Sequence, residues 1–119
     1  MHKSDGFEDL IVWREAIKLA KDIFSLYENC KNFSLKNQIE RSAISISSNI
    51  AEGYELDTNR QFIKYLFIAK ASCGEVRSQL LLSREIQLFP QDKLTPLIES
   101  ARKLSVMIYK LIQERRKRK

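Results

Sequence analysis

A chain of 119 residues can bury a hydrophobic core, and we expect one domain over residues 1–119. With 44% hydrophobic and 30% charged residues but only three glycines and two prolines, the composition favours long helices and leaves little room for hairpins. The chain shows neither the apolar run of a signal peptide nor a membrane-spanning window, so we expect a cytoplasmic protein without membrane contacts.

The first amphipathic segment is predicted from about Leu10 to Cys30, after a flexible arm of residues 1–8. Apolar residues at spacings of 4, 3, 4 and 3 predict a core seam made of Trp13, Ile17, Ala20, Phe24 and Tyr27. A second apolar stripe lies on a different side and contains Val12, Leu19 and Leu26.

The second helix is predicted from a cap at Ser34 to about Tyr54, with Gly53 near its end. Its core seam contains Leu35, Ile39, Ala43, Ile46 and Ile50. The opposite side carries Arg41, Ser45, Ser48 and Glu52, with Asn49 at its edge. Small polar residues are poor helix formers but permit close approach, so we interpret this side as a helix or subunit contact. A plain solvated face is the alternative.

The third helix is predicted from a cap at Thr58 to about Gln87. Spacings of 4 and 3 define its core seam of Phe62, Leu66, Ala69, Cys73, Val76 and Leu80. A second stripe contains Ile63, Phe67, Leu81 and Gly74. Because a glycine inside a helix is unfavourable, Gly74 predicts a close approach by another backbone.

The fourth helix should begin between Gln91 and Pro96, since proline is tolerated in the first turn, and it continues into a basic C-terminal end. Its core seam contains Leu97, Ala101, Leu104, Ile108 and Leu111. Four helices with short connections predict an all-α, antiparallel up-down-up-down four-helix bundle. The second apolar stripes on the first and third helices predict a homo-oligomer.

Positive charge is concentrated at the C-terminus. The net charge is +6, yet residues 1–114 carry 16 basic and 15 acidic residues, because five basic residues form the tail: Arg115, Arg116, Lys117, Arg118 and Lys119. Such a tail attracts phosphates without sequence preference, although a solubilising helix end is the alternative. Further candidate contacts lie on the third helix, at Lys64, Lys70 and Arg77, each of which has an ordinary solvated charge as its alternative.

Residues suited to catalysis are scarce. His2 is the only histidine, which argues against histidine-based acid–base chemistry and against di-iron ligands. Cys30 and Cys73 have no metal-binding spacing and are expected to be reduced thiols. We therefore expect no catalytic residue, no metal, no cofactor, no small-molecule substrate and no enzyme activity. Arg41 and Glu75 are expected to face outward and to form a charge-assisted contact within or between subunits.

Several segments together resemble one protein family. They include the opening Phe7-Glu8-Asp9-Leu10 with Val12-Trp13, and the run Ser48-Asn49-Ile50-Ala51-Glu52-Gly53. Over roughly residues 7–112 the chain resembles the bacterial four-helix bundle proteins known as 23S rRNA-intervening sequence proteins. These are similar to the accessory protein of diversity-generating retroelements, a homopentameric barrel thought to engage nucleic acid and a reverse transcriptase. The resemblance implies a helical bundle assembled as a pentamer, but no defined biochemical activity.

Two functions remain open from the sequence. The first is a non-enzymatic protein that binds structured RNA or an RNA–DNA hybrid by charge and shape, because oligomerisation would multiply the tail charges. The second is a protein-interaction scaffold, or an accessory subunit of a nucleic-acid enzyme, that makes no direct contact with nucleic acid.

Overall fold

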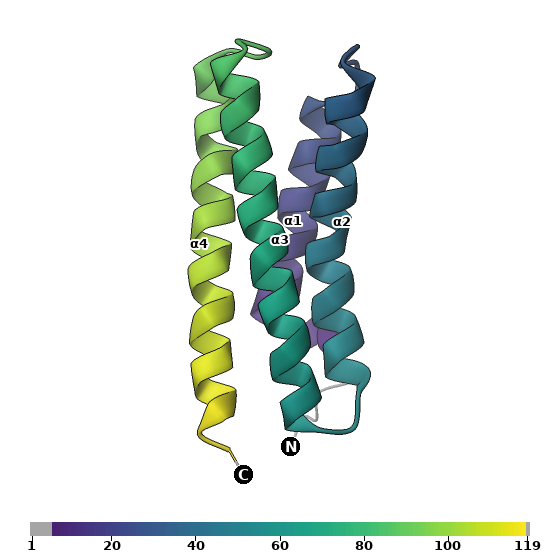
Figure 1. Ribbon diagram of the computed structural model, residues 1–119, viewed down its shortest axis with the longest axis vertical. Coiled ribbons are helices and arrows are strands. Elements are labelled where there is room, and N and C mark those ends of the chain that lie inside the picture. Colours follow the sequence, from purple (N-terminus) through teal and green to yellow (C-terminus); the bar gives the residue numbers. More distant parts are fainter. Residues whose placement is uncertain (1–5, 119) are drawn as a thin grey trace.

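The computed structural model describes residues 6–118, in which a short 3-10 helix and four α-helices follow one another. Their bounds are η1 (Phe7–Asp9), α1 (Ile11–Leu26), α2 (Phe33–Glu55), α3 (Asn59–Glu85) and α4 (Gln91–Arg116). Residues 6–118 contain no strand and extend over 47 × 23 × 22 Å (Figure 1). The prediction of an all-α four-helix protein is confirmed.

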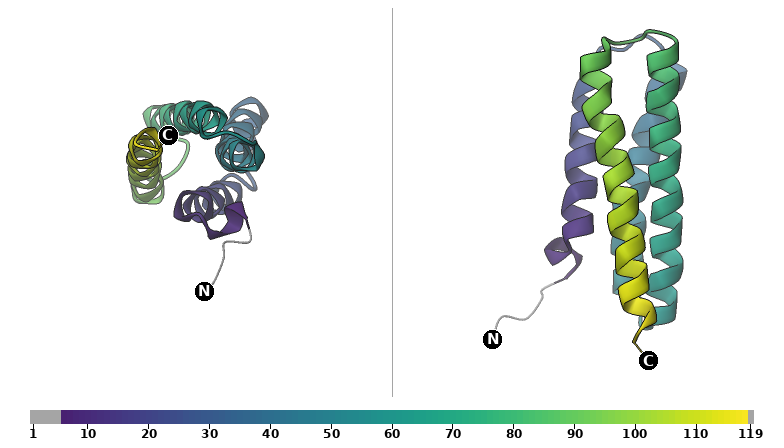
Figure 2. Two further views of the ribbon diagram at one scale, coloured as in Figure 1. Left: turned by 90° about the horizontal axis from the view of Figure 1, so that it is seen from below. Right: turned by 90° about the vertical axis from the view of Figure 1, so that its left-hand side faces the viewer.

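The four helices surround one core, and each packs against two others. Contacts join α1 to α2, α2 to α3, α3 to α4, and α4 back to α1, as the end-on view in Figure 2 shows. At one end, the Asn59 side chain at the start of α3 donates to the Arg115 carbonyl at the end of α4 (2.6 Å). At the other end, Tyr27 after α1 contacts Ser83 near the end of α3. The first half of α3 therefore lies beside the second half of α4.

Side-chain caps fix two of the helix starts. Thr58 accepts a hydrogen bond from the Gln61 backbone N–H (3.1 Å), which confirms the predicted cap of α3. The predicted cap at Ser34 is wrong, because Asn32 accepts from the Leu35 N–H (3.1 Å) and α2 already begins at Phe33. An amide oxygen two residues earlier satisfies the same kind of unpaired helix donor. The start of α4 at Gln91 lies within the predicted range.

Two residues of the predicted N-terminal arm, Phe7 and Glu8, belong to η1. Residues 1–5, including His2, lie outside the described residues, but Phe7 begins η1 rather than belonging to an arm. The Phe7 ring packs against Trp13, with 5.2 Å between ring centroids. This aromatic contact holds η1 against the first turn of α1.

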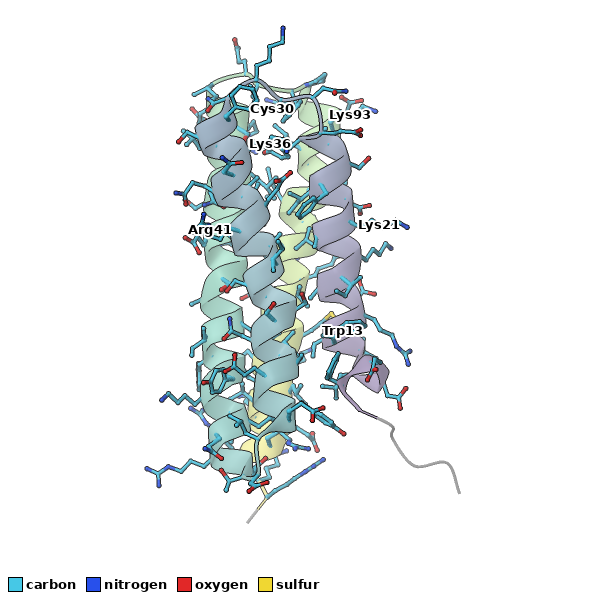
Figure 3. The ribbon with its side chains drawn as sticks, turned by 90° about the vertical axis from the view of Figure 1, so that its right-hand side faces the viewer. Trp13, Lys21, Cys30, Lys36, Arg41 and Lys93 are labelled. Atoms are coloured by element: carbon cyan, nitrogen blue, oxygen red, sulfur yellow. The ribbon has the colours of Figure 1, made fainter. Side chains whose placement is uncertain are left out.

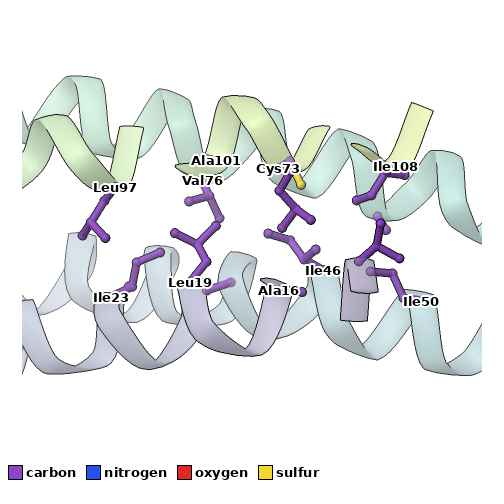
Figure 4. Close-up of a cluster of buried hydrophobic side chains, with 14 of the residues drawn as sticks. Ala16, Leu19, Ile23, Ile46, Ile50, Cys73, Val76, Leu97, Ala101 and Ile108 are labelled. Carbon is purple, nitrogen blue, oxygen red and sulfur yellow. The ribbon is translucent and has the colours of Figure 1, made fainter. Parts of the chain in front are cut away.

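The core consists of apolar side chains from all four helices, and Figure 4 shows one cluster of them between facing helices. The predicted seams of α2 and α3 are buried, and in α4 Leu97, Ala101, Leu104 and Ile108 are buried as predicted, while Leu111 is half-buried. The predicted core seam of the first helix is correct only at Tyr27, which is fully buried, while Trp13 and Ala20 are half-buried. The buried residues of α1 are Val12, Ala16, Leu19 and Ile23, whereas Ile17 is 39% exposed and Phe24 is 40% exposed.

The error in α1 has a physical cause. The two apolar stripes of this helix have the same 4, 3, 4 spacing, so periodicity alone does not decide which one faces inward. The buried stripe contains Ala16, whose small side chain is fully enclosed. Of the other stripe, Ile17 and Phe24 remain exposed on α1, and Figure 3 shows Trp13, which is half-buried, near the start of this helix.

The two helical glycines have opposite surroundings. Gly53 lies within α2 and is buried where this helix approaches α3. The predicted close approach at Gly74 is wrong for the single chain, because a Cβ placed there would meet nothing within 4 Å. Gly53, which the sequence placed at a helix end, therefore permits the close packing of two helices.

Candidate nucleic-acid interface

The two halves of the chain carry opposite charge. Residues 1–57, which include α1 and α2, contain seven basic and ten acidic residues, whereas residues 58–116, which form α3 and α4, contain eleven basic and five acidic residues. No acidic residue occurs in the ranges 58–74 and 100–113. These ranges cover the first half of α3 and much of the second half of α4, which lie side by side. The fold therefore gathers uncompensated positive charge at one end of the α3–α4 pair.

A shallow groove follows the outer boundary of α3 and α4, with a volume of about 380 Å³. We call it the α3–α4 groove, and its lining residues are Lys70, Ser105, Val106, Tyr109, Lys110 and Gln113. The Lys70 ammonium lies 5.8 Å from the centroid of the Tyr109 ring. The groove thus combines two cations, an aromatic ring and two polar side chains without a carboxylate.

A second cation–aromatic pair extends the line of the groove toward the C-terminus. The Arg116 guanidinium lies 5.2 Å from the centroid of the Phe67 ring. Phe67 is one helical turn before Lys70 on α3, and both Phe67 and Tyr109 are 38% exposed. Cations are attracted to the negative face of an aromatic ring, so the side chains of Lys70 and Arg116 are held against the surface of α3 and α4.

The predicted tail is partly docked on the bundle. Arg115 and Arg116 still belong to α4, and only Lys117 and Arg118 follow within the described residues; Lys119 lies outside them. The Arg115 Nε donates to Asn59 Oδ1 (2.9 Å), and its guanidinium lies 4.7 Å from the Phe62 ring centroid. Partial burial and the nearby Arg118 lower the pKa of Arg115. Arg115 therefore contributes to the closure of the bundle rather than to a detached tail.

The three basic residues predicted on α3 are not grouped together. Lys70 is half-buried and lines the α3–α4 groove, whereas Lys64 and Arg77 are exposed at other positions of the helix surface. Within residues 6–118 none of the three forms an ion pair. Of the sequence-predicted α3 candidates, only Lys70 joins the groove.

The small polar face of α2 divides into a packed part and an exposed part. The Ser45 hydroxyl lies 2.9 Å from the Ser72 hydroxyl of α3, and Asn49 donates to the Ser45 carbonyl (2.8 Å) and hydroxyl (3.0 Å). Ser45 therefore forms a helix–helix contact within the chain, and Asn49 bonds to it from the next turn of α2. The exposed part consists of Arg41, Ser48 and Glu52. In Figure 3 Arg41 points away from the bundle, and in the described part of the chain no ion pair joins it to the exposed Glu75.

The titratable groups in the core are placed for packing rather than for chemistry. Burial raises the pKa of the Cys73 thiol to about 12, so this sulfur is protonated near neutral pH and is a poor nucleophile. Over residues 6–118 no three His, Cys, Asp or Glu side chains are grouped so that they could hold a metal ion. None of the helices in this range is long and apolar enough to cross a membrane.

Sequence reasoning missed two residues that line the α3–α4 groove, Tyr109 and Lys110, and the role of Phe67 next to it. The two long stretches without an acidic residue could have indicated this surface. The nearly equal numbers of basic and acidic residues over residues 1–114 concealed them. Only the pairing of α3 with α4 places these stretches together.

Comparison with known proteins bears on the fold and on the family of this chain. No curated protein matches this chain. Among solved structures, a protein of unknown function from the S23 ribosomal protein family of Bacteroides thetaiotaomicron superposes with a TM-score of 0.82. The match covers 86% of this chain and 98% of that protein at 24% sequence identity, which supports the four-helix fold.

The sequence model of the 23S rRNA-intervening sequence proteins matches residues 8–110, which is most of the chain. This range includes all of α1, α2 and α3, and it ends within α4. The protein therefore belongs to the 23S rRNA-intervening sequence protein family.

Proposed function

We propose that this protein is a non-enzymatic, homo-oligomeric bundle with antiparallel, up-down-up-down helices that binds nucleic acid in the cytoplasm through charge and shape. The expected ligands are structured RNA and RNA–DNA hybrids, both of which present closely spaced phosphates. The observation that carries the proposal is the segregation of charge, with eleven basic and five acidic residues in the range 58–116. Uncompensated lysine and arginine side chains attract phosphates and release their counterions.

Oligomerisation is supported by apolar side chains that the single chain leaves exposed. Ile17 and Phe24 of α1 and Ile44 of α2 are exposed, and Phe24 and Ile44 line a shallow groove of about 370 Å³ between the two helices. A different face, on α3, exposes Ile68, Leu82 and Ile86. Two different apolar faces favour a head-to-tail contact, which closes into a ring when the rotation between neighbours permits it. The family resemblance favours a ring of five copies.

The proposal is tested by titrating salt during binding to a structured RNA hairpin, an RNA–DNA hybrid and an unrelated duplex of equal length. We expect binding to all three at low salt, with a slope of about −0.7 to −0.9 in log K against log salt for each phosphate neutralised. Sedimentation equilibrium on the same samples gives the number of copies. Absence of binding at low salt would rule out the nucleic-acid function.

The second candidate is a scaffold or accessory subunit that contacts other proteins. The observation in its favour is the apolar surface of Ile17, Phe24 and Ile44, which resembles a docking surface for a helix. Under this alternative, nucleic-acid binding is absent or insensitive to salt. A protein partner, such as a nucleic-acid enzyme, would then bind the unaltered protein, and charged substitutions in this surface would abolish that binding.

A further inference from the structure

We propose that the α3–α4 groove binds a single-stranded stretch of nucleic acid, with bases stacked on its aromatic rings and phosphates held by its cations. This inference rests on the proposed function and adds the binding mode: the ligand's unpaired loop or overhang, rather than its duplex part, occupies the groove. It also places the principal contact on the helical body, which includes Arg116 at the end of α4, and not on the residues that follow this helix.

The aromatic rings supply the first argument. Phe67 and Tyr109 are each 38% exposed on a positively charged surface, and neither ring belongs to the buried core of the bundle. Every base has a π-face, so aromatic side chains beside cations bind single strands without strong sequence preference. A paired base inside a duplex has its faces covered by its neighbours and is not available for such stacking.

The arrangement of cations supplies the second argument. The Lys70 ammonium lies against Tyr109 at 5.8 Å, and the Arg116 guanidinium lies against Phe67 at 5.2 Å. Lys110 adds a third positive charge to the groove lining. Each cation lies over the face of its ring, so a base that stacks there displaces the cation toward the adjacent phosphate, which matches the alternation of base and phosphate along a strand.

The lining favours nucleic acid over a symmetric contact with the same surface of another copy. Val106 offers an apolar contact, while Ser105 and Gln113 offer hydrogen-bond donors and acceptors. Such groups recognise the edges of unstacked bases. The range 100–113 contains no carboxylate that would repel phosphate, and the charge of this surface opposes the docking of another copy's equally basic face.

The experiment separates stacking from charge. Tyr109→Leu and Phe67→Leu keep apolar bulk at exposed positions but remove the π-face, and the probes are a uridine-rich single strand and a duplex RNA of equal length. We expect Tyr109→Leu to weaken single-strand binding about tenfold, with a smaller loss for Phe67→Leu, without changing the salt slope or duplex binding. Phe33→Leu, which alters an exposed aromatic residue at the start of α2, is the control and should bind like the unaltered protein.

The double substitution Lys70→Gln with Lys110→Gln tests the phosphate contacts. We expect the salt slope for the single strand to fall by about 1.4, which corresponds to two phosphates. Lys18→Gln with Lys21→Gln on α1 removes the same charge elsewhere and should change the slope less. Circular dichroism melting of each variant checks that the bundle remains folded.

The possible outcomes distinguish a failure of this inference from a failure of the proposed function. If the leucine variants bind the single strand as tightly as the unaltered protein, the groove is not the site, while salt-dependent binding would leave the proposed function standing. If Tyr109→Leu instead reduces the sedimentation mass, the groove is a subunit contact and the inference is overturned. If the unaltered protein binds neither probe at low salt, both the inference and the proposed function fail.

Discussion

Gly53 of α2 lies against Tyr65 of α3 so closely that a Cβ placed on the glycine would be 2.6 Å from the Cβ of Tyr65. The same added atom would lie 3.2 Å from Cδ1 of Phe62, a core residue. No rotamer change relieves a contact with a Cβ atom, because this atom is fixed to the backbone. α2 and α3 can therefore approach each other this closely only because Gly53 has no side chain.

The two helical glycines should respond in opposite ways to alanine. Gly53→Ala forces α2 and α3 apart and is expected to lower the free energy of unfolding by about 1–3 kcal/mol. Gly74→Ala meets nothing within 4 Å and is expected to raise it by about 0.4–1 kcal/mol, because alanine restricts the unfolded chain. Urea denaturation measures both. A loss of stability at Gly74 would reveal a close neighbour contributed by another copy.

A buried hydroxyl pair links the end of α1 to α3. Tyr27 and Ser83 are both fully buried, their hydroxyl oxygens are 2.6 Å apart, and Ser83 Oγ donates to the Gln79 carbonyl. Tyr27 therefore donates to Ser83. Ser83→Ala should cost about 1–3 kcal/mol, because it leaves the Tyr27 hydroxyl without an acceptor, whereas Tyr27→Phe should cost about 1 kcal/mol. Thermal unfolding of both variants tests this order, and the reverse order would contradict the donor assignment.

The Cys73 thiol should make stability depend on alkaline pH. Its pKa rises from 9.0 to about 12 on folding, so the unfolded chain releases this proton first. Stability is then lost as the pH rises above 9, by up to about 1.4 kcal/mol per pH unit. Cys73→Ala should be less stable at neutral pH but show a shallower decline over the same range. Denaturant midpoints measured from pH 8 to pH 11 test this, and equal slopes would contradict it.

The docking of Arg115 changes how the tail should be tested by truncation. Removing residues 115–119 breaks the contacts with Asn59 and Phe62, so we expect a loss of about 1 kcal/mol or more in unfolding free energy. Removing residues 117–119 alone leaves these contacts and should leave Tm nearly unchanged. Asn59→Ala should reproduce much of the cost of the longer truncation. If both truncations melt alike, the hydrogen bonds of Arg115 contribute nothing to stability.

The exposed α1 surface should control assembly. Phe24→Glu places a charge on a side chain that is exposed in the single chain, so the bundle should stay folded while the oligomer dissociates. Ser25→Glu adds the same charge at the neighbouring exposed position of α1 and is the matched control. Sedimentation equilibrium measures the mass of each variant. An unchanged mass for Phe24→Glu would exclude this surface as the subunit contact.

Several features followed from the sequence alone because they depend on local chemistry. α2 has a single dominant apolar stripe, and the most regular stripe of α3, from Phe62 to Leu80, is the buried one, so periodicity identified the buried side of both helices. The cap at Thr58 depends on residues within one turn, and α4 begins at Gln91, within the predicted range, with Pro96 in its second turn. The same segments carried the family resemblance, which the match over residues 8–110 confirms.

Other features were decided only when the helices packed. α1 has two apolar stripes of equal regularity, and its neighbours α2 and α4 determined that Val12 and Leu19 face inward while Ile17 and Phe24 remain exposed. Arg115 left the predicted tail because Asn59, 56 positions earlier, lies beside it. The α3–α4 groove likewise joins Lys70 to Tyr109. Such relationships depend on distances between residues far apart in the chain, which local spacing does not encode.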